Sequence, residues 1–173
     1  RTFDANHLPA EPERARELAL RSSPFLAAVR GLGLPERRAG DEGAFVACAY
    51  VDGESLLAVL GRCTQLKRPP PLAVALSLAL DACAGLTALH RRGLGSAPML
   101  HLAVRPSNLL VGYHGRLQLT DASLAASPEQ LLLDAAFSPG LAQFIAPELL
   151  PQGDTDAPVG ASADLYALAA VLY

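Results

Sequence analysis

The chain has 173 residues, a mass of 18.0 kDa and a formal net charge of −3 at pH 7. Hydrophobic residues make up 51% of it and charged residues 18%, a balance that argues against wholesale disorder and leaves room for one ordinary domain with a core. A pI of about 5.8 argues against a sequence-independent nucleic-acid binder, which would need a basic face. We therefore expect no nucleic-acid partner.

The composition favours helices, because 33 leucines and 32 alanines together form more than a third of the chain. The three cysteines, Cys48, Cys63 and Cys83, lack metal-ligand spacing and are expected to be buried or incidental thiols. No signal peptide is visible, so we expect a cytoplasmic location, with a membrane anchor outside these residues left open.

The first third of the chain predicts a helix, two strands and a second helix. Residues 10–21 carry a proline and acidic residues where a first helical turn accepts them. Two apolar runs of strand length follow at 25–34 and 44–51, separated by a polar turn. Residues 53–62 then have the pattern of a short helix.

A long apolar segment at 72–92 predicts the main helix, after a proline-rich linker. It is apolar nearly all round and is therefore expected to be buried. Asp81 interrupts it, and prolines and arginines flank it, so a core helix fits it better than a membrane span. We expect no membrane segment within the chain.

The remaining elements are a hairpin and a last helix. Residues 109–119 alternate around the turn at 112–115, which predicts a β-hairpin with one buried face. Residues 144–150 are expected to hold one helical turn. An apolar helix is expected over 162–173, with Ser162 as its N-cap and with Leu165 and Leu168 on an exposed face.

Three polar residues border the predicted hairpin: His101 and Asn108 precede it, and Asp121 follows it. Each has an ordinary structural explanation, as a hydrogen-bonded core histidine, a turn residue and a cap. Together, Asn108 and Asp121 bring two oxygen-bearing side chains to one cleft. Such a pair suits Mg²⁺, which takes one or two protein oxygens and completes its shell with phosphates and water.

The segment that holds these residues resembles a family motif. Residues 101–108, HLAVRPSN, resemble the catalytic loop H-R-D-x-K-P-x-N, and the hairpin that ends in Asp121-Ala122-Ser123 resembles the strand pair that ends in D-F-G. Further segments match in order and spacing: 16–33 the end of a helix and the next strand, 45–56 the hinge strand, 72–92 the helix before the catalytic loop, 140–148 the A-P-E segment, and 162–173 a central helix. The sequence thus resembles the protein kinase family, especially the eukaryotic-like serine/threonine kinases of bacteria.

The resemblance implies an α+β, protein-kinase-like fold. Residues 1–51 would form a partial N-lobe, and residues 52–173 would form the first half of a mainly helical C-lobe. Family domains run to about 250 residues or more, so the domain is expected to be truncated at both ends. The family's Gly-rich phosphate loop and third-strand lysine have no match, and Lys67 lies in a proline linker where it cannot serve.

The resemblance also carries family roles onto single residues of the catalytic loop. Ala103 occupies the position of the catalytic aspartate, which accepts or orients the proton of the substrate hydroxyl, and Arg105 occupies that of the catalytic-loop lysine. Asn108 and Asp121 match the metal ligands. Because a methyl group cannot act as a base, whose loss costs about 10²–10⁴ in rate, phosphoryl transfer is expected to be impaired.

The resemblance also implies which residues would surround a bound nucleotide. They are Cys48, Ala49, Val51, Glu54 and Leu110. Adenine would bond the backbone of Ala49 and Val51, between Cys48 at the back of the pocket and Leu110 beneath the ring. Glu54 would reach the ribose, or it is a solvated turn residue. Three further matches are structural in the family: His101, Glu148 and Asp164.

Three functions stay open at this point. The first is a nucleotide-binding pseudokinase that holds ATP and Mg²⁺ without efficient transfer. The second is a signalling scaffold that binds no nucleotide, in which Asn108 and Asp121 only cap the hairpin. The third is a slow but active serine/threonine kinase, because phosphoryl transfer depends largely on positioning and electrostatics. A protein substrate or signalling partner is expected in each case.

Overall fold

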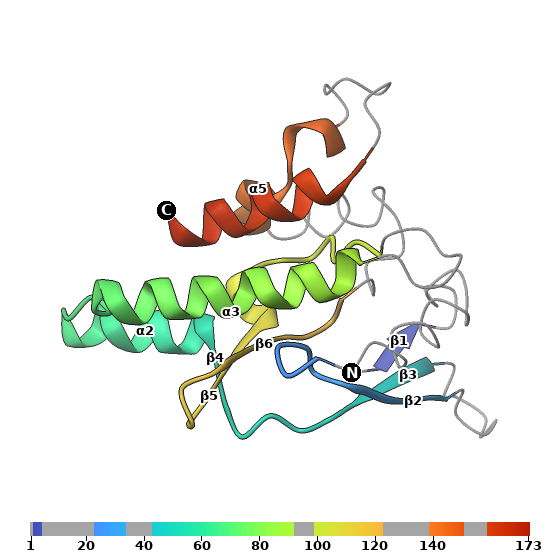
Figure 1. The fold of residues 1–173 in the computed structure, drawn as a ribbon, viewed down its shortest axis with the longest axis horizontal. Coiled ribbons are helices and arrows are strands. Elements are labelled where there is room, and N and C mark those ends of the chain that lie inside the picture. The colour runs from blue at the N-terminus through green and yellow to red at the C-terminus, as the bar shows by residue number, and fades with distance from the viewer. Residues whose placement is uncertain (1, 5–22, 34–42, 92–98, 123–138, 151–158) are drawn as a thin grey trace.

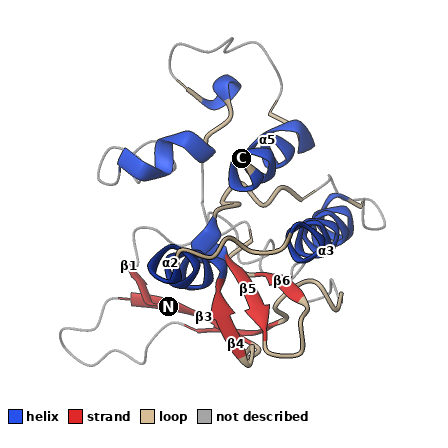
Figure 2. Cartoon of the chain, turned by 90° about the vertical axis from the view of Figure 1, so that its left-hand side faces the viewer, coloured by secondary structure: helices blue, strands red, loops and turns tan. Residues whose placement is uncertain are grey.

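The computed structural model describes residues 2–4, 23–33, 43–91, 99–122, 139–150 and 159–173. Two small antiparallel sheets lie on one side of the molecule, and helices lie over them (Figure 1). The view turned by 90° shows the same mixed α+β arrangement (Figure 2). The helix predicted at 10–21 lies outside the described residues.

The first sheet has the strand order β1-β3-β2, with β1 at Thr2–Asp4, β2 at Val29–Gly33 and β3 at Gly43–Cys48. The two strands predicted here are present but shorter than expected, and β1 was not predicted. β2 starts late because the chain before it turns back toward the second sheet, where Leu26 forms a bridge with Leu119.

The second sheet has the order β4-β5-β6, with β4 at Gly53–Ser55, β5 at Leu109–Gly112 and β6 at Leu117–Leu119. The predicted hairpin of β5 and β6 is confirmed. The helix predicted from residue 53 is corrected, because Gly53–Ser55 pairs with β5. Helix α2 follows at Leu56–Leu66, where the Ser55 hydroxyl oxygen accepts a hydrogen bond from Ala58 N at 3.2 Å.

Helix α3, Leu72–His90, confirms the main helix predicted at 72–92. Its burial is less complete than expected. Its second half packs on β6 and on α5, with Leu86 and Leu89 fully buried. Its first half leaves large side chains exposed, including Leu72 at 74% and Leu80 at 71%. In the described part of the chain, α3 has the length and apolar character of a membrane-crossing helix, a property that core helices share.

Gly85 explains how α3 comes so close to the sheet. A Cβ atom at this position would lie 2.6 Å from the Leu119 side chain and 2.8 Å from the Phe25 carbonyl oxygen. Glycine therefore lets the helix lie directly on β6, although it weakens a helix interior. The core forms at this contact, from the fully buried Leu86, Leu89, Leu109, Leu117 and Leu119.

Helix α5, Ala161–Leu172, starts one residue earlier than predicted, with Gly160 rather than Ser162 at its N-cap. The Ser162 hydroxyl instead lies 3.4 Å from a carboxylate oxygen of Glu148. Leu168 is buried at 4% exposure, which corrects its predicted exposure, whereas Leu165 is exposed. The helical turn predicted within 144–150 is present as the 3-10 turn Pro147–Leu149, and a second 3-10 turn, Pro139–Phe144, precedes it.

Candidate active site

The hairpin brings Asn108 and Asp121 to the same end of the second sheet. Leu109 pairs with Leu119, so the residue before β5 lies across from the residues after β6. One backbone hydrogen bond fixes this approach, from Thr120 N to the Asn108 carbonyl oxygen at 3.0 Å. Asn108 is buried, and Asp121 is partly buried with a left-handed backbone at φ 61°. Such a φ is uncommon outside glycine but is better tolerated by aspartate than by most residues.

The Asn108 side chain is held in one orientation. Its amide nitrogen donates to the Ala103 carbonyl oxygen at 2.9 Å, and its amide oxygen accepts from the Ser107 hydroxyl at 3.1 Å. An amide oxygen has a second lone pair, so it can still bind a cation. In the described residues, no group of three or more His, Cys, Asp or Glu side chains is placed to hold a metal. An ion at Asn108 and Asp121 would therefore need ligands from a bound phosphate and water.

Asp164 holds the loop that precedes Asn108. Its carboxylate accepts hydrogen bonds from His101 N at 2.8 Å, from Leu102 N at 2.7 Å and from the ring of His90 at 2.8 Å. Burial alone would raise the pKa of Asp164, but the hydrogen bonds from His90 and from the two backbone N–H groups outweigh it and hold the pKa low. The carboxylate thus keeps Leu102 in a left-handed conformation at φ 56°.

His101 lies beneath this loop and is fully buried. Its Nδ1 accepts a hydrogen bond from Ala103 N at 3.2 Å, so the proton of the neutral ring is on Nε2. Burial lowers the pKa of His101, although the charges of Asp164 and Asp121 and the Thr120 carbonyl favour the protonated ring. The ring is therefore a neutral support for the loop at physiological pH.

Ala103 lies where these contacts converge. Its N–H binds the His101 ring and its carbonyl binds the Asn108 amide, so the backbone at this position is fixed from both sides. Its side chain is a methyl group, which can neither accept nor orient a proton. Arg105, two residues on, is half-buried, and its Nε atom is buried without a hydrogen-bond partner in the described residues.

Four of the residues predicted around the nucleotide lie between the end of β3 and the middle of β4, and the fifth, Leu110, lies in β5. Ala49 N donates to the Ala28 carbonyl oxygen at 2.7 Å, and Val51 makes no hydrogen bond within the described residues. Burial and the charge of Asp121 raise the pKa of the Cys48 thiol, which therefore lies within electrostatic reach of the hairpin end. Leu110 is half-buried in β5. Glu54 is exposed in β4, where its carboxylate accepts from the Tyr113 hydroxyl at 3.3 Å.

Asp81 is a supporting residue whose role is not evident from the sequence. It is buried in α3, where it accepts from Leu117 N at 3.0 Å and pairs with Arg116 at 3.2 Å. Arg116 also lies 5.9 Å from the centre of the Phe25 ring. These bonds tie the hairpin to α3. A single acidic residue in an otherwise apolar helix was the signal that could have revealed it.

The sequence matches no protein-family model. It is 32% identical over 136 residues to a serine/threonine-protein kinase named drp72 of Corynebacterium efficiens. The match covers 78% of this chain and 24% of drp72. It is 28% identical over 160 residues to the serine/threonine-protein kinase PknA of Mycobacterium tuberculosis, covering 92% of this chain and 34% of PknA. It is also 41% identical over 86 residues to CBL-interacting protein kinase 16 of Oryza sativa subsp. japonica. That match covers 49% of this chain and 17% of the rice protein.

The chain thus spans between about a sixth and a third of the length of these relatives. All three are named as protein kinases, and the mixed architecture of helices and small antiparallel sheets fits an α+β kinase-like fold. The similarity therefore supports a protein kinase family for this chain, which holds a serine/threonine kinase-like domain.

Proposed function

We propose that this domain binds ATP with Mg²⁺ but transfers phosphate poorly, as a nucleotide-binding pseudokinase. The observation that carries the proposal is the contrast at Ala103. The backbone there is fixed by His101 and Asn108, whereas the side chain offers no proton acceptor.

Asn108 and Asp121 would hold the metal, together with the phosphates that complete its coordination. When bound, the ion would neutralise charge on the phosphates. Arg105 supports this reading, because its guanidinium is a cation three positions before Asn108 in the chain and its buried Nε has no hydrogen-bond partner among the described residues. At the other end of the site, the carbonyl of Ala49 and the backbone of Val51 are the groups proposed to bind adenine, between Cys48 and Leu110.

Glu54 has the least support as a ribose contact, because its carboxylate already accepts a hydrogen bond from Tyr113. His101, Glu148 and Asp164 are proposed to act as structural residues. The proposed boundary between the two lobes falls between residues 51 and 52, in the connection between β3 and β4.

Nucleotide binding is tested by titrating the protein with ATP in a calorimeter, with magnesium and with EDTA. We expect binding that weakens without the metal, and a similar weakening in Asp121→Asn, which keeps the shape of the side chain but removes its charge. Asp52 is an exposed aspartate in the connection between β3 and β4. Asp52→Asn makes the same chemical change and serves as the matched control, which should leave ATP binding unchanged. The absence of binding at millimolar ATP would favour the scaffold that binds no nucleotide.

A further inference from the structure

Helix α2 is apolar but has no buried residue. Leu57 and Leu66 are 58% and 52% exposed, and the remaining apolar side chains of the helix are at most partly buried. The helix packs on β4, on β5 and on the turn at Pro106–Asn108. An amphipathic helix ordinarily covers its apolar stripe, so the side of α2 that faces away from these contacts is a surface that the described residues leave open.

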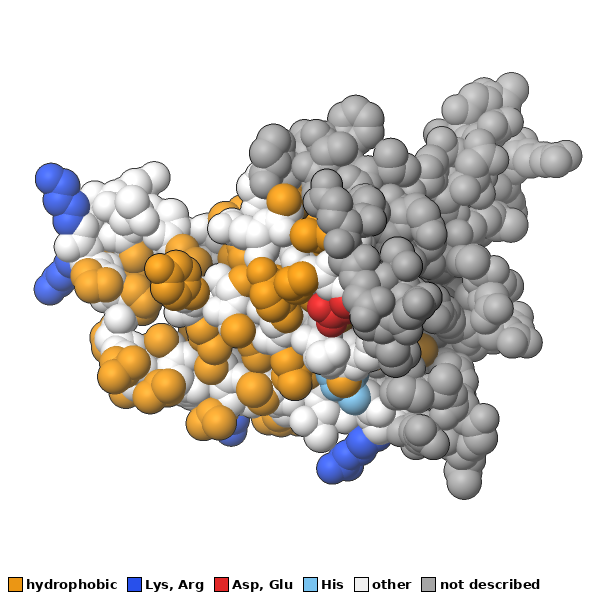
Figure 3. Space-filling model, turned by 90° about the horizontal axis from the view of Figure 1, so that it is seen from above, with side chains coloured by type: hydrophobic (Ala, Val, Ile, Leu, Met, Phe, Trp, Pro, Cys, Tyr) orange, Lys and Arg blue, Asp and Glu red, His pale blue; other side chains and the backbone are white. Residues whose placement is uncertain are grey.

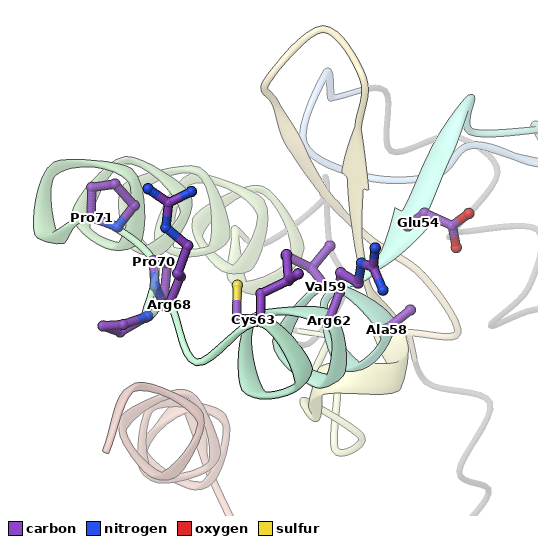
Figure 4. A pocket seen from close by; sticks show the side chains of 10 residues that line it. Glu54, Ala58, Val59, Arg62, Cys63, Arg68, Pro70 and Pro71 are labelled. Carbon is purple, nitrogen blue, oxygen red and sulfur yellow. The ribbon is translucent and has the colours of Figure 1, made fainter.

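A groove runs between α2 and the linker to α3. It has a volume of about 870 Å³, and Ala58, Val59, Cys63 and Leu66 form its apolar floor. Pro69–Pro71 forms the facing wall (Figure 4). Prolines have a fixed φ and no N–H group, so this wall is stiff and apolar. The volume falls within the range of pockets that bind ligands.

Basic side chains border the groove. Arg62 and Arg68 both line it, with Cys63 between them (Figure 4). Arg62 donates to the Gln65 side chain at 3.2 Å, and no side-chain contact engages Arg68 within the described residues. One acidic residue, Glu54, also lines the groove, where its carboxylate accepts a hydrogen bond from the Tyr113 hydroxyl at 3.3 Å. The stretch from residue 55 to 80 contains three basic residues and no acidic one, although the whole chain has a net charge of −3. Basic side chains project from the end of the molecule where α2 leads into α3 (Figure 3).

We propose that this groove binds an acidic peptide segment of a protein partner. Aliphatic side chains of the peptide would lie on the floor formed by α2, and its carboxylates would pair with Arg62 and Arg68. Guanidinium groups bind carboxylates through two parallel hydrogen bonds, which supplies the specificity for an acidic ligand. The inference does not depend on ATP binding, because none of the proposed nucleotide-binding residues except Glu54 lines the groove.

The probe is a fluorescein-labelled peptide, Asp-Glu-Leu-Leu-Asp-Glu-Leu, measured by fluorescence anisotropy with the purified protein. We expect binding that is lost when serines replace the leucines of the peptide or when lysines replace its acidic residues. The double substitution Arg62→Gln and Arg68→Gln should weaken binding at least tenfold. Arg30→Gln, an exposed arginine on β2, is the matched control and should have no effect. Equal binding of the serine peptide, or equal loss in the control, would overturn the proposal.

The cysteines provide a second readout within the same molecule. Cys63 lines the groove, whereas Cys83 is exposed on α3 and lies outside the groove lining. Saturating peptide should slow iodoacetamide alkylation of Cys63, measured by mass spectrometry, and should leave Cys83 unchanged. Equal alkylation of Cys63 with and without peptide would contradict the proposal. So would arginine-dependent binding to phosphatidylserine vesicles without peptide binding, since that result would assign the groove to a membrane surface.

Discussion

Asp81 in α3 and Asp164 in α5 are both buried carboxylates in apolar helices, but they support different parts of the molecule. Asp81 accepts one backbone N–H, from the hairpin, and its charged partner Arg116 has a side chain that is 62% exposed. Asp164 accepts two backbone N–H groups, from the candidate catalytic loop, and its partner His90 is only 17% exposed.

The difference between the two carboxylates shows where the fold is most constrained. A regular hairpin satisfies most of its own backbone groups, so one anchor to α3 is sufficient. The loop at 101–105 pairs with no strand of the described residues, and its backbone depends on a side chain that reaches it from α5. Buried polar groups must be paired, so the loop should be the more sensitive of the two regions.

The largest effect is expected from Asp164→Ala, which should lower the free energy of unfolding by about 3–5 kcal/mol in urea denaturation. It leaves two backbone N–H groups unpaired and removes what holds Leu102 in its left-handed conformation. Asp164→Asn keeps a hydrogen-bond acceptor and should lower the free energy of unfolding by less. A loss of unfolding free energy below about 1 kcal/mol in the alanine variant would show that water replaces the carboxylate and that the loop does not depend on Asp164.

Asp81→Ala should cost about 1–3 kcal/mol, because Leu117 N is buried and would lose its acceptor. Arg116→Gln should cost at most about 1 kcal/mol, since ion pairs with an exposed partner contribute little. Urea denaturation of both variants separates the two contributions. Equal losses would mean that the ion pair, rather than the backbone bond, anchors the hairpin.

Two glycine substitutions compare α3 with α2. Gly85→Ala should destabilise by about 1–3 kcal/mol, because its Cβ meets Leu119 and the Phe25 carbonyl oxygen. Gly61→Ala, where no described residue lies within 4 Å of the added Cβ, should stabilise the fold by about 0.5–1 kcal/mol through helix propensity. Thermal unfolding of the two variants gives opposite shifts if α3 is a packed helix and α2 a surface helix. Shifts of the same sign would contradict this comparison.

The smallest effect concerns pH. Burial lowers the pKa of His101, so the neutral ring stabilises the fold fully above its unfolded pKa of about 6.5, and this contribution is lost as the pH falls toward the folded pKa. The lowered pKa of Asp164 acts in the same direction but only below about pH 4. In His101→Asn, where an amide oxygen replaces Nδ1, unfolding free energies between pH 7.5 and 5 should depend less on pH. An unchanged slope would assign the titration elsewhere.

Local patterns predicted much of the fold. The alternation of Leu117 and Leu119 with polar residues predicted the hairpin and its buried face, and the apolar run at 72–92 predicted α3. The strand β4 was missed because three residues carry almost no periodic signal, and its pairing with β5 joins positions more than fifty residues apart. Ser162 was assigned as a cap from its residue type, but its hydroxyl is directed to Glu148, a contact that only the tertiary arrangement reveals.

The motif resemblance named the candidate site residues and the structural residues His101 and Asp164, but it did not reveal the support from Asp81. Motif spacing identified Asn108 and Asp121, and the hairpin register then explains why they lie at one end of the sheet. The role of Asp81 required knowing which face of α3 meets Leu117. Similarly, the even distribution of apolar residues in α3 could not show that its first half would be exposed, because periodicity does not identify the neighbours of a helix.

The central claim is that the domain binds ATP with Mg²⁺ and that its phosphate transfer is slow because position 103 holds alanine in place of a base. The most direct test is phosphate transfer from labelled ATP to a library of serine- and threonine-containing peptides, measured for the protein and for Ala103→Asp. The account predicts very slow transfer that rises by at least about 10²-fold in Ala103→Asp and stays low in Ala103→Asn, which has the same shape but is no base. No rise in a variant that still binds ATP and Mg²⁺ would contradict the claim.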